Sequence, residues 1–161
     1  MITPSLLTDA KSLLNACRAR GMRLATAESC TGGLIIATLT AIAASSDVVN
    51  CGFVTYSNQA KHEVLGVPTA LIVRLGAVSD EVAHSMAEGA LARSNADLAV
   101  SVTGVAGPDG ASVEKPVGLV CFGLARRGRA VAGDRQIFPG NRTAIRAAAV
   151  AHAFVMIRAG L

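Results

Sequence analysis

Three short apolar segments, each followed directly by small polar residues and glycines, constrain the fold of this chain more than any other feature. They span residues 22–27, 48–56 and 98–103, lengths that suit buried strands. Segments with helical patterns lie between them, at 34–42 and 79–94. Strands that alternate with helices form βαβ crossovers, which produce a parallel sheet with helices on both faces. The sequence therefore predicts an α/β fold, a three-layer α/β/α sandwich.

The remaining elements follow from cap residues and turn residues. Thr3 and Pro4 open a helix that Gly21 ends. A short helix follows Ser57 and ends at Gly66, and a last helix covers 142–158. Residues 117–125 and 130–138 predict a hairpin around Arg127-Gly128. We thus expect one domain over residues 1–161, whose mostly parallel sheet carries an antiparallel edge hairpin.

The mild basic charge suits an anionic partner, and a phosphate-bearing small molecule explains it as well as DNA does. The chain has 161 residues, 52% of them apolar, and a net charge of only +4. Nucleic-acid binders concentrate Lys and Arg and add stacking aromatic residues, whereas this chain has one Tyr and no Trp. We interpret the one dense basic stretch, Arg126, Arg127 and Arg129, as an exposed hairpin tip. No nucleic-acid partner is expected.

The cysteines and the N-terminus indicate a reduced, cytoplasmic protein. The cysteines are widely spaced and form no C-x-x-C pair, and the three histidines do not have zinc spacing. We therefore expect no metal site. Asp9 and Lys11 interrupt any signal-peptide pattern. The longest apolar run, 34–44, is too short to cross a bilayer, so no membrane partner is expected.

Polar segments at 28–33, 56–61 and 103–110 follow the three predicted strands. Ligands of open α/β sheets bind beyond the carboxyl ends of the strands. We therefore expect these three segments to meet and form the functional site.

The first polar segment places Ser29 at a strand-to-helix turn. Gly32 and Gly33 allow the backbone to approach a ligand closely. The free N–H groups of the following helix would bind a phosphate or an oxyanion. An ordinary helix cap is the commoner outcome of such a pattern.

The second and third polar segments supply a candidate base and a candidate hydroxyl. Lys61 falls in a first helical turn, and if desolvated it would become a neutral amine able to take a proton from serine. A solvated surface lysine is the alternative. The Thr103 hydroxyl would donate to an oxyanion or orient the base, and the N–H groups near Gly104 would face a ligand. A plain turn is again the alternative.

Two arginines stand four residues apart on the last predicted helix. Arg142 and Arg146 therefore share one helix face and together would clamp a phosphate. Two solvated surface arginines fit the same spacing.

Taken together, the motifs resemble the CinA C-terminal domain family, whose characterised activity is nicotinamide-nucleotide amidase. The resemblance rests on Ala-Glu-Ser-Cys-Thr-Gly-Gly at 27–33 and Gly-Phe-Val-Thr-Tyr-Ser-Asn at 52–58 with Lys61. It continues with Leu-Gly-Val at 65–67, Gly-Ala-Val-Ser at 76–79, Thr-Gly-Val-Ala-Gly-Pro at 103–108 and Lys-Pro-Val-Gly at 115–118. It covers nearly the whole chain, in order. It implies an α/β/α fold that converts nicotinamide mononucleotide to nicotinate mononucleotide and ammonia.

The resemblance also implies residue roles. Ser29 would be the nucleophile and Lys61 its base, with Tyr56 completing the catalytic group by holding or relaying the proton. Backbone N–H groups near Cys30 or near Gly104 would stabilise the oxyanion. The expected substrate-binding residues are Glu28, Cys30, Thr31, Gly32, Gly33, Asn58, Thr103, Gly104, Arg142 and Arg146.

The pyridinium charge already activates the carboxamide, so no cofactor is expected, and we expect a homo-oligomer. The chain departs from the family pattern in loops: Ala-Ala-Ser-Ser stands at 43–46 in place of Pro-Gly-Ser-Ser, Gly110-Ala111 in place of a Gly-Gly, and Gly-Asn-Arg at 140–142 in place of Gly-Asp-Arg.

Three other functions remain open from sequence. Cys30 would serve a thiol amidase with His62 or His84 as base. A non-enzymatic nucleotide-binding module linked to competence or DNA-damage responses would bind without releasing ammonia. A weak nucleic-acid binder would use the basic hairpin tip.

Overall fold

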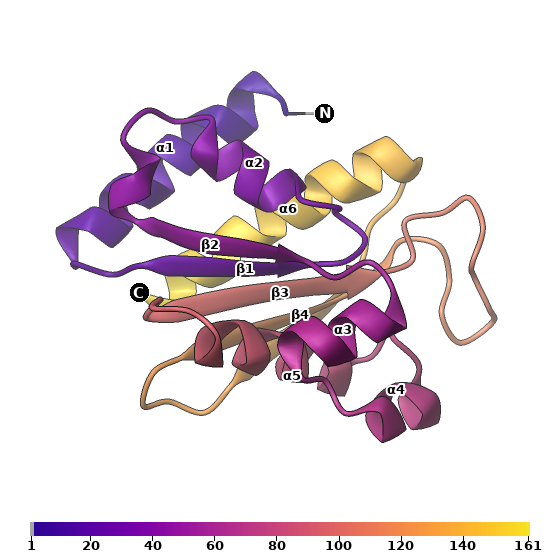
Figure 1. Ribbon diagram of the computed structural model, residues 1–161. Helices are drawn as coiled ribbons and strands as arrows, with labels where there is room; N and C mark the ends of the chain where they lie inside the picture. The colour runs from indigo at the N-terminus through magenta and orange to yellow at the C-terminus, as the bar shows by residue number, and fades with distance from the viewer. Residues whose placement is uncertain (1) are drawn as a thin grey trace.

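The computed structural model describes residues 2–161, in which a five-stranded sheet lies between two layers of helices (Figure 1). The strands are β1 (Leu24–Glu28), β2 (Val49–Val54), β3 (Leu98–Gly104), β4 (Leu119–Arg126) and β5 (Ala132–Ile137), in the order β2-β1-β3-β4-β5. The helices are α1 (Pro4–Ala19), α2 (Leu34–Thr40), α3 (Asn58–Leu65), α4 (Thr69–Leu75), α5 (Asp80–Ala92) and α6 (Arg142–Gly160), with a 3-10 turn η1 (Ser45–Asp47). The predicted α/β sandwich is confirmed.

The sheet is mixed rather than mostly parallel. Strand β1 pairs in parallel with β2 and with β3, whereas β4 runs antiparallel to both β3 and β5. The loop between β3 and β4 contains no crossover helix, so the chain returns in the opposite direction. The hairpin is therefore an antiparallel edge, as predicted, and its first strand makes the sheet mixed.

Cap residues set the ends of the helices near the places the sequence predicts. The Thr3 hydroxyl accepts from the N–H of Leu6, and Ser57 accepts from Ala60 at the start of α3. Gly66 ends α3 in the left-handed conformation, with φ of 74°. Because Ser57 fixes where α3 begins, it also fixes which α3 residues face the sheet.

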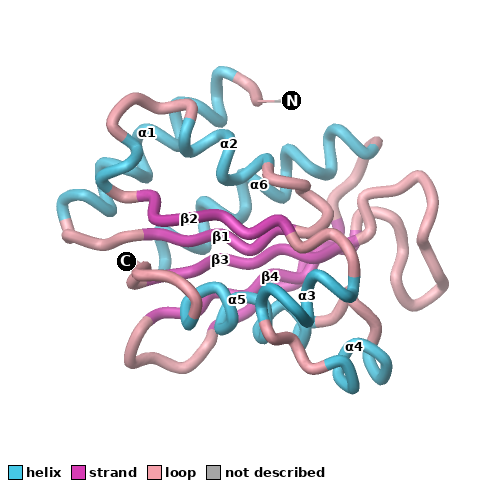
Figure 2. The backbone as a smooth tube through the Cα atoms, viewed as in Figure 1, coloured by secondary structure: helices cyan, strands magenta, loops and turns pink. Residues whose placement is uncertain are grey.

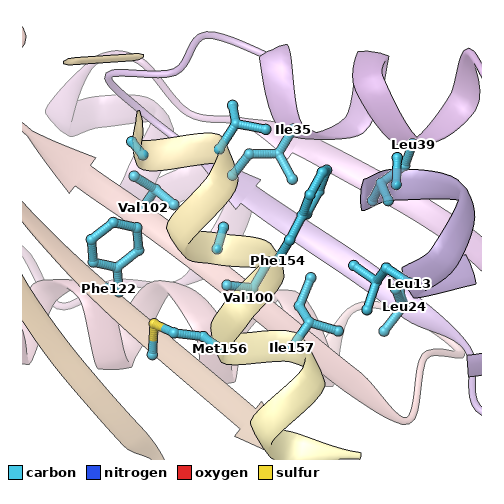
Figure 3. Packing of buried hydrophobic residues seen from close by; sticks show 14 of the residues in the cluster. Leu13, Leu24, Ile35, Leu39, Val100, Val102, Phe122, Phe154, Met156 and Ile157 are labelled. Carbon is cyan, nitrogen blue, oxygen red and sulfur yellow. The ribbon is translucent and has the colours of Figure 1, made fainter. Parts of the chain in front are cut away.

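Each face of the sheet has its own apolar core. Helices α1, α2 and α6 cover one face and α3, α4 and α5 the other (Figures 1 and 2). Phe154 and Ile157 of α6 pack with Val100 of β3 in the larger core (Figure 3). The smaller core joins Leu65 and Met86. These aliphatic contacts hold α3 against the sheet beside the end of β1.

The basic hairpin tip binds the ends of two helices. Arg126 donates to the carbonyls of Gly160 and Leu161, and Arg127 donates to those of Leu91, Ser94 and Ala96. Arg127 and Arg129 are exposed as predicted, whereas Arg126 is half-buried. The guanidinium groups of Arg126 and Arg127 are already occupied by backbone oxygens. Among residues 2–161, no helix combines the length and hydrophobicity needed to cross a membrane.

Candidate active site

The three polar segments meet in one cavity of about 260 Å³ at the carboxyl ends of β1, β2 and β3. Figure 2 shows the loops that follow these strands gathered at one edge of the sheet. The cavity is lined by Ser29, Cys30, Tyr56, Asn58, Lys61, Ala77, Val78, Thr103, Gly104, Val105, Ala106, Gly107, Asp109, Gly110 and Arg142. The predicted convergence of the three segments is confirmed.

Ser29 stands at the point where β1 leaves the sheet. Its N–H still donates to the Val102 carbonyl at 2.9 Å, so its backbone position is fixed by β3. The chain then turns sharply, with the Gly32 N–H donating back to the Ser29 carbonyl. Gly32 and Gly33 have φ of 58° and 89°, values that favour glycine. The turn leaves the Ser29 side chain at the cavity wall, 8% exposed.

Lys61 reaches the same point from α3 and is only 1% exposed. Its Nζ lies 2.9 Å from the Ser29 Oγ, 2.8 Å from the Thr55 carbonyl oxygen and 3.4 Å from the Tyr56 carbonyl oxygen. None of the ion pairs within residues 2–161 includes it. Burial without a carboxylate disfavours the charged amine and lowers the pKa of Lys61 to about 8.

This set of partners suits an amine that gains and loses a proton. Two of the three partners are carbonyl oxygens, which can only accept. The third, the Ser29 hydroxyl, can accept from a charged amine or donate to the lone pair of a neutral one. All three positions on the Lys61 nitrogen are therefore filled in either protonation state.

Glu28, which the sequence assigns to substrate binding, is not among the residues that line the cavity. Its side chain is fully buried, and its carboxylate accepts from the N–H groups of Ile35 and Ile36 at 3.0 and 2.9 Å. Thr26 donates a further hydrogen bond at 3.3 Å. The anion site expected at the start of α2 is thus occupied by the protein's own carboxylate, which suits the positive end of the helix dipole.

Four further residues that the sequence assigns to substrate are not among those that line the cavity: Thr31, Gly32, Gly33 and Arg146. Thr31 is fully buried, and its carbonyl accepts from Arg146 at 2.6 Å. Arg146 therefore braces the Ser29 turn from α6. The structure does not bring it together with Arg142 at the cavity, because its guanidinium contacts the turn instead.

Thr103 and Gly104 both line the cavity, and both also make contacts that hold neighbouring segments in place. The Thr103 hydroxyl donates to the Ala77 carbonyl at 2.8 Å, which links β3 to the segment before α5. In this structure its proton is therefore directed at the Ala77 carbonyl rather than at Ser29 or Lys61. Gly104 allows β4 to approach, because a Cβ there would lie 2.6 Å from the Leu119 carbonyl oxygen.

Arg142 crosses the mouth of the cavity. It is the first residue of α6, which is capped by the Asn141 side chain. One guanidinium nitrogen donates to the Gly107 carbonyl at 2.9 Å and the other to the Tyr56 hydroxyl at 3.1 Å. The hydroxyl of Tyr56 thus contacts Arg142, whereas only its carbonyl contacts Lys61.

Two contributors were missed from sequence. The Thr55 carbonyl is the nearest partner of Lys61, but a backbone oxygen has no sequence signature. Asp109 lines the cavity from the third polar segment. A lone carboxylate among glycines was the feature of the sequence that could have identified it.

The groups needed by a thiol amidase are not assembled. Cys30 lines the cavity, but burial raises the pKa of its thiol to about 12. His62 contacts the Val67 carbonyl, and His84 lines a different cavity beside Asp80. In the described part of the chain, no cluster of three His, Cys, Asp or Glu residues has a metal-binding arrangement.

Comparison with known proteins identifies the family to which this chain is similar. A model of the CinA C-terminal domain matches residues 7–161. A nicotinamide-nucleotide amidohydrolase PncC from Enterobacter agglomerans is 53% identical over 131 residues, 81% of this chain and 80% of that protein. The protein of the same name from Escherichia coli K12 is 46% identical over 154 residues, 95% of this chain and 93% of that protein.

Longer relatives and a crystal structure extend the comparison. A CinA-like protein of Geobacter sulfurreducens is 54% identical over 130 residues, but this chain spans only 31% of its length. The crystal structure of competence/damage inducible protein CihA from Agrobacterium tumefaciens matches with a TM-score of 0.95 at 46% identity, over 99% of this chain and 97% of that one. In sequence and in structure, this chain belongs to the CinA C-terminal domain family.

Proposed function

We propose that this protein is a nicotinamide-nucleotide amidohydrolase, which converts nicotinamide mononucleotide and water to nicotinate mononucleotide and ammonia. The names of the two PncC relatives support the substrate class. The observation that carries the mechanism is the 2.9 Å contact between the Lys61 amine and the Ser29 hydroxyl inside a cavity. Ser29 is the nucleophile and Lys61 the general base.

In the first half of the reaction, neutral Lys61 takes the Ser29 proton while Oγ bonds to the carboxamide carbon. The carbonyl π electrons move to oxygen and form a tetrahedral oxyanion. When the oxyanion collapses, the C–N bond breaks, and Lys61 returns the proton to the leaving nitrogen, so that ammonia departs and an acyl-serine ester remains.

In the second half, water attacks the ester carbon and Lys61 takes a proton from it. The ester C–O bond then breaks, Ser29 recovers a proton from Lys61, and nicotinate mononucleotide leaves. Lys61 thus ends each half of the cycle in its starting state.

The oxyanion needs N–H donors beside Ser29. The Cys30 N–H comes directly after the nucleophile at the cavity wall, and none of the turn and loop backbone hydrogen bonds of residues 2–161 uses it. We assign it as one donor. A donor of this kind lowers the barrier by about 3–4 kcal/mol.

The substrate phosphate is assigned to Arg142, with the α6 N-terminus beside it. Arg142 is the cationic side chain at the mouth of the cavity, whereas Lys61 lies at its floor. The group that binds the substrate phosphate is thus not the group that transfers the proton.

The test is an ammonia-release assay with a panel of pyridine nucleotides on the wild type, Ser29→Ala and Lys61→Met. Both variants are expected to lose roughly a thousandfold or more in kcat while keeping the native circular dichroism spectrum. Ser46→Ala, which removes an exposed hydroxyl from η1, is the matched control with wild-type turnover. Wild-type turnover by Ser29→Ala would remove Ser29 from the mechanism. Tight nucleotide binding without ammonia release by the wild type would favour the non-enzymatic binding module.

A further inference from the structure

Tyr56 presents two polar atoms to the cavity region, and they serve different neighbours. Its carbonyl oxygen accepts from Lys61 at 3.4 Å, and its hydroxyl accepts from Arg142 at 3.1 Å. The side chain is 61% exposed, whereas Lys61 is 1% exposed. The phenol therefore lies at the mouth of the cavity, away from the buried amine.

The Lys61 nitrogen has no position left for the phenol. Besides its own Cε, it contacts the Ser29 hydroxyl and the carbonyls of Thr55 and Tyr56. A tetrahedral amine accommodates three such partners and no more. A proton passing from Ser29 to the leaving nitrogen thus needs only Lys61.

The ring of Tyr56 is the only aromatic side chain among the residues that line the cavity. An aromatic face carries negative charge density and attracts a cation placed over it. The ring of a nicotinamide nucleotide is a pyridinium cation. The Arg142 guanidinium, which the phenol contacts, suits the phosphate at the other end of such a molecule.

We propose that Tyr56 recognises the substrate instead of relaying the proton. Its ring binds the cationic pyridinium, and its hydroxyl positions Arg142 for the phosphate. This inference deepens the proposed amidohydrolase function and rests on it. It makes Tyr56 a determinant of specificity for substrates that combine a cationic ring with a phosphate.

The experiment separates the ring from the hydroxyl with two variants and two ligands. Tyr56→Phe keeps the ring and removes the hydroxyl, whereas Tyr56→Leu removes both. Nicotinamide mononucleotide carries the phosphate, and nicotinamide riboside lacks it. KM and kcat are measured for the mononucleotide, and the riboside is measured as its competitive inhibitor.

We expect Tyr56→Phe to raise KM for the mononucleotide about threefold to tenfold, with kcat within about twofold of the wild type. Its inhibition constant for the riboside should match the wild type, since the hydroxyl acts only through Arg142. Tyr56→Leu should weaken both ligands, because both contain the pyridinium. The inflection of kcat near pH 8 should be the same in all three proteins.

A loss of kcat of about a hundredfold in Tyr56→Phe, with KM unchanged, would overturn the proposal, because it would place the phenol in the proton path. Dissociation constants of the mononucleotide, measured by calorimetry on Ser29→Ala and Ser29→Ala/Tyr56→Phe, read out recognition without turnover. If the wild type releases no ammonia, the proposed function fails, and these constants still decide the role of Tyr56: equal values overturn it.

Discussion

At Lys61, the burial that removes the amine from water also prepares it to act as a base. Its pKa falls from 10.5 to about 8, so the neutral form that can accept the Ser29 proton grows as pH rises through 8. We predict that kcat for ammonia release rises with pH, with one inflection near 8 and a plateau above it. A profile from pH 6 to 10 tests this, and a kcat that falls over this range would contradict it. Lys61→Arg, which stays charged, should be inactive throughout.

Glu28 is predicted to support activity without touching the substrate. In Glu28→Gln the amide oxygen still accepts one N–H of α2, but the amide nitrogen opposes the other. We expect a loss of about 1–3 kcal/mol in unfolding free energy and a lower kcat, because the Ser29 turn loosens. Denaturant unfolding and the ammonia assay measure both effects. Glu63→Gln, an exposed exchange on α3, is the control, and equal behaviour of the two variants would refute the role.

The sequence predicts which segments meet, but it does not predict the direction in which each side chain points. Ser29 and Lys61 were predicted to meet because each follows a parallel strand, and the two side chains are in contact. Glu28 and Arg146 were assigned to substrate because local sequence does not show which way a side chain turns. Glu28 turns back onto α2, and Arg146 reaches the Thr31 carbonyl, 115 residues away in the chain.

At the scale of elements, caps and periodicity predicted the five strands and the helices α1, α2, α3, α5 and α6 within a few residues. Helix α4 and the turn η1 were missed. Helix α4 starts after Pro68 without a side-chain cap, and its residues Ile72 and Val73 favour strands as much as helices. Its helical form depends on tertiary packing, since Ile72 is buried against the core that contains Met86.

The hairpin between β4 and β5 is predicted to stabilise α5 through one side chain. Arg127 donates to the carbonyls of Leu91, Ser94 and Ala96 around the end of that helix. We expect Arg127→Ala to lower the free energy of unfolding by about 1 kcal/mol and to leave kcat unchanged, because the cavity lies at the other end of the sheet.

Arg129→Ala is the control for the same charge loss, since Arg129 has no side-chain hydrogen bond among those of residues 2–161. Urea denaturation of both variants tests the difference, and equal midpoints would contradict it. The same contacts weaken the case for a nucleic-acid binder, because they occupy the guanidinium groups that would face phosphates.

At the scale of the whole molecule, alkaline pH is predicted to destabilise the fold. Burial raises the pKa of Cys17 to about 11 and the pKa values of Cys30 and Cys121 to about 12. Above pH 9 these thiols ionise in the unfolded chain but not in the folded one, so stability falls as pH rises. The lowered pKa of Lys61 has the opposite effect, because between about pH 8 and 10.5 the unfolded chain binds a proton there that the folded one does not, so stability rises with pH. The destabilisation from the three thiols exceeds the stabilisation from the one amine. We expect the free energy of unfolding to fall by a net amount on the order of 5 kcal/mol by pH 11.

Urea denaturation midpoints from pH 7 to 11 measure this loss under reducing conditions. Cys17→Ala, which lies far from the cavity in α1, should have a shallower decline above pH 9 than the wild type. A midpoint that stays level to pH 11 would show that the thiols ionise alike in both states.

The layers of the molecule were predictable because alternating strands and helices leave few ways to cover a sheet. The direction of β4 decides how much of the sheet is antiparallel. That direction could be predicted only from the absence of a helix between residues 105 and 118.

The amine of Lys61 is held by the main-chain oxygens of Thr55 and Tyr56, which every residue type possesses. Replacing either side chain removes neither oxygen. Substitutions that alter ligand preference at the rim can therefore accumulate over evolutionary time while the proton-transfer apparatus beneath stays intact.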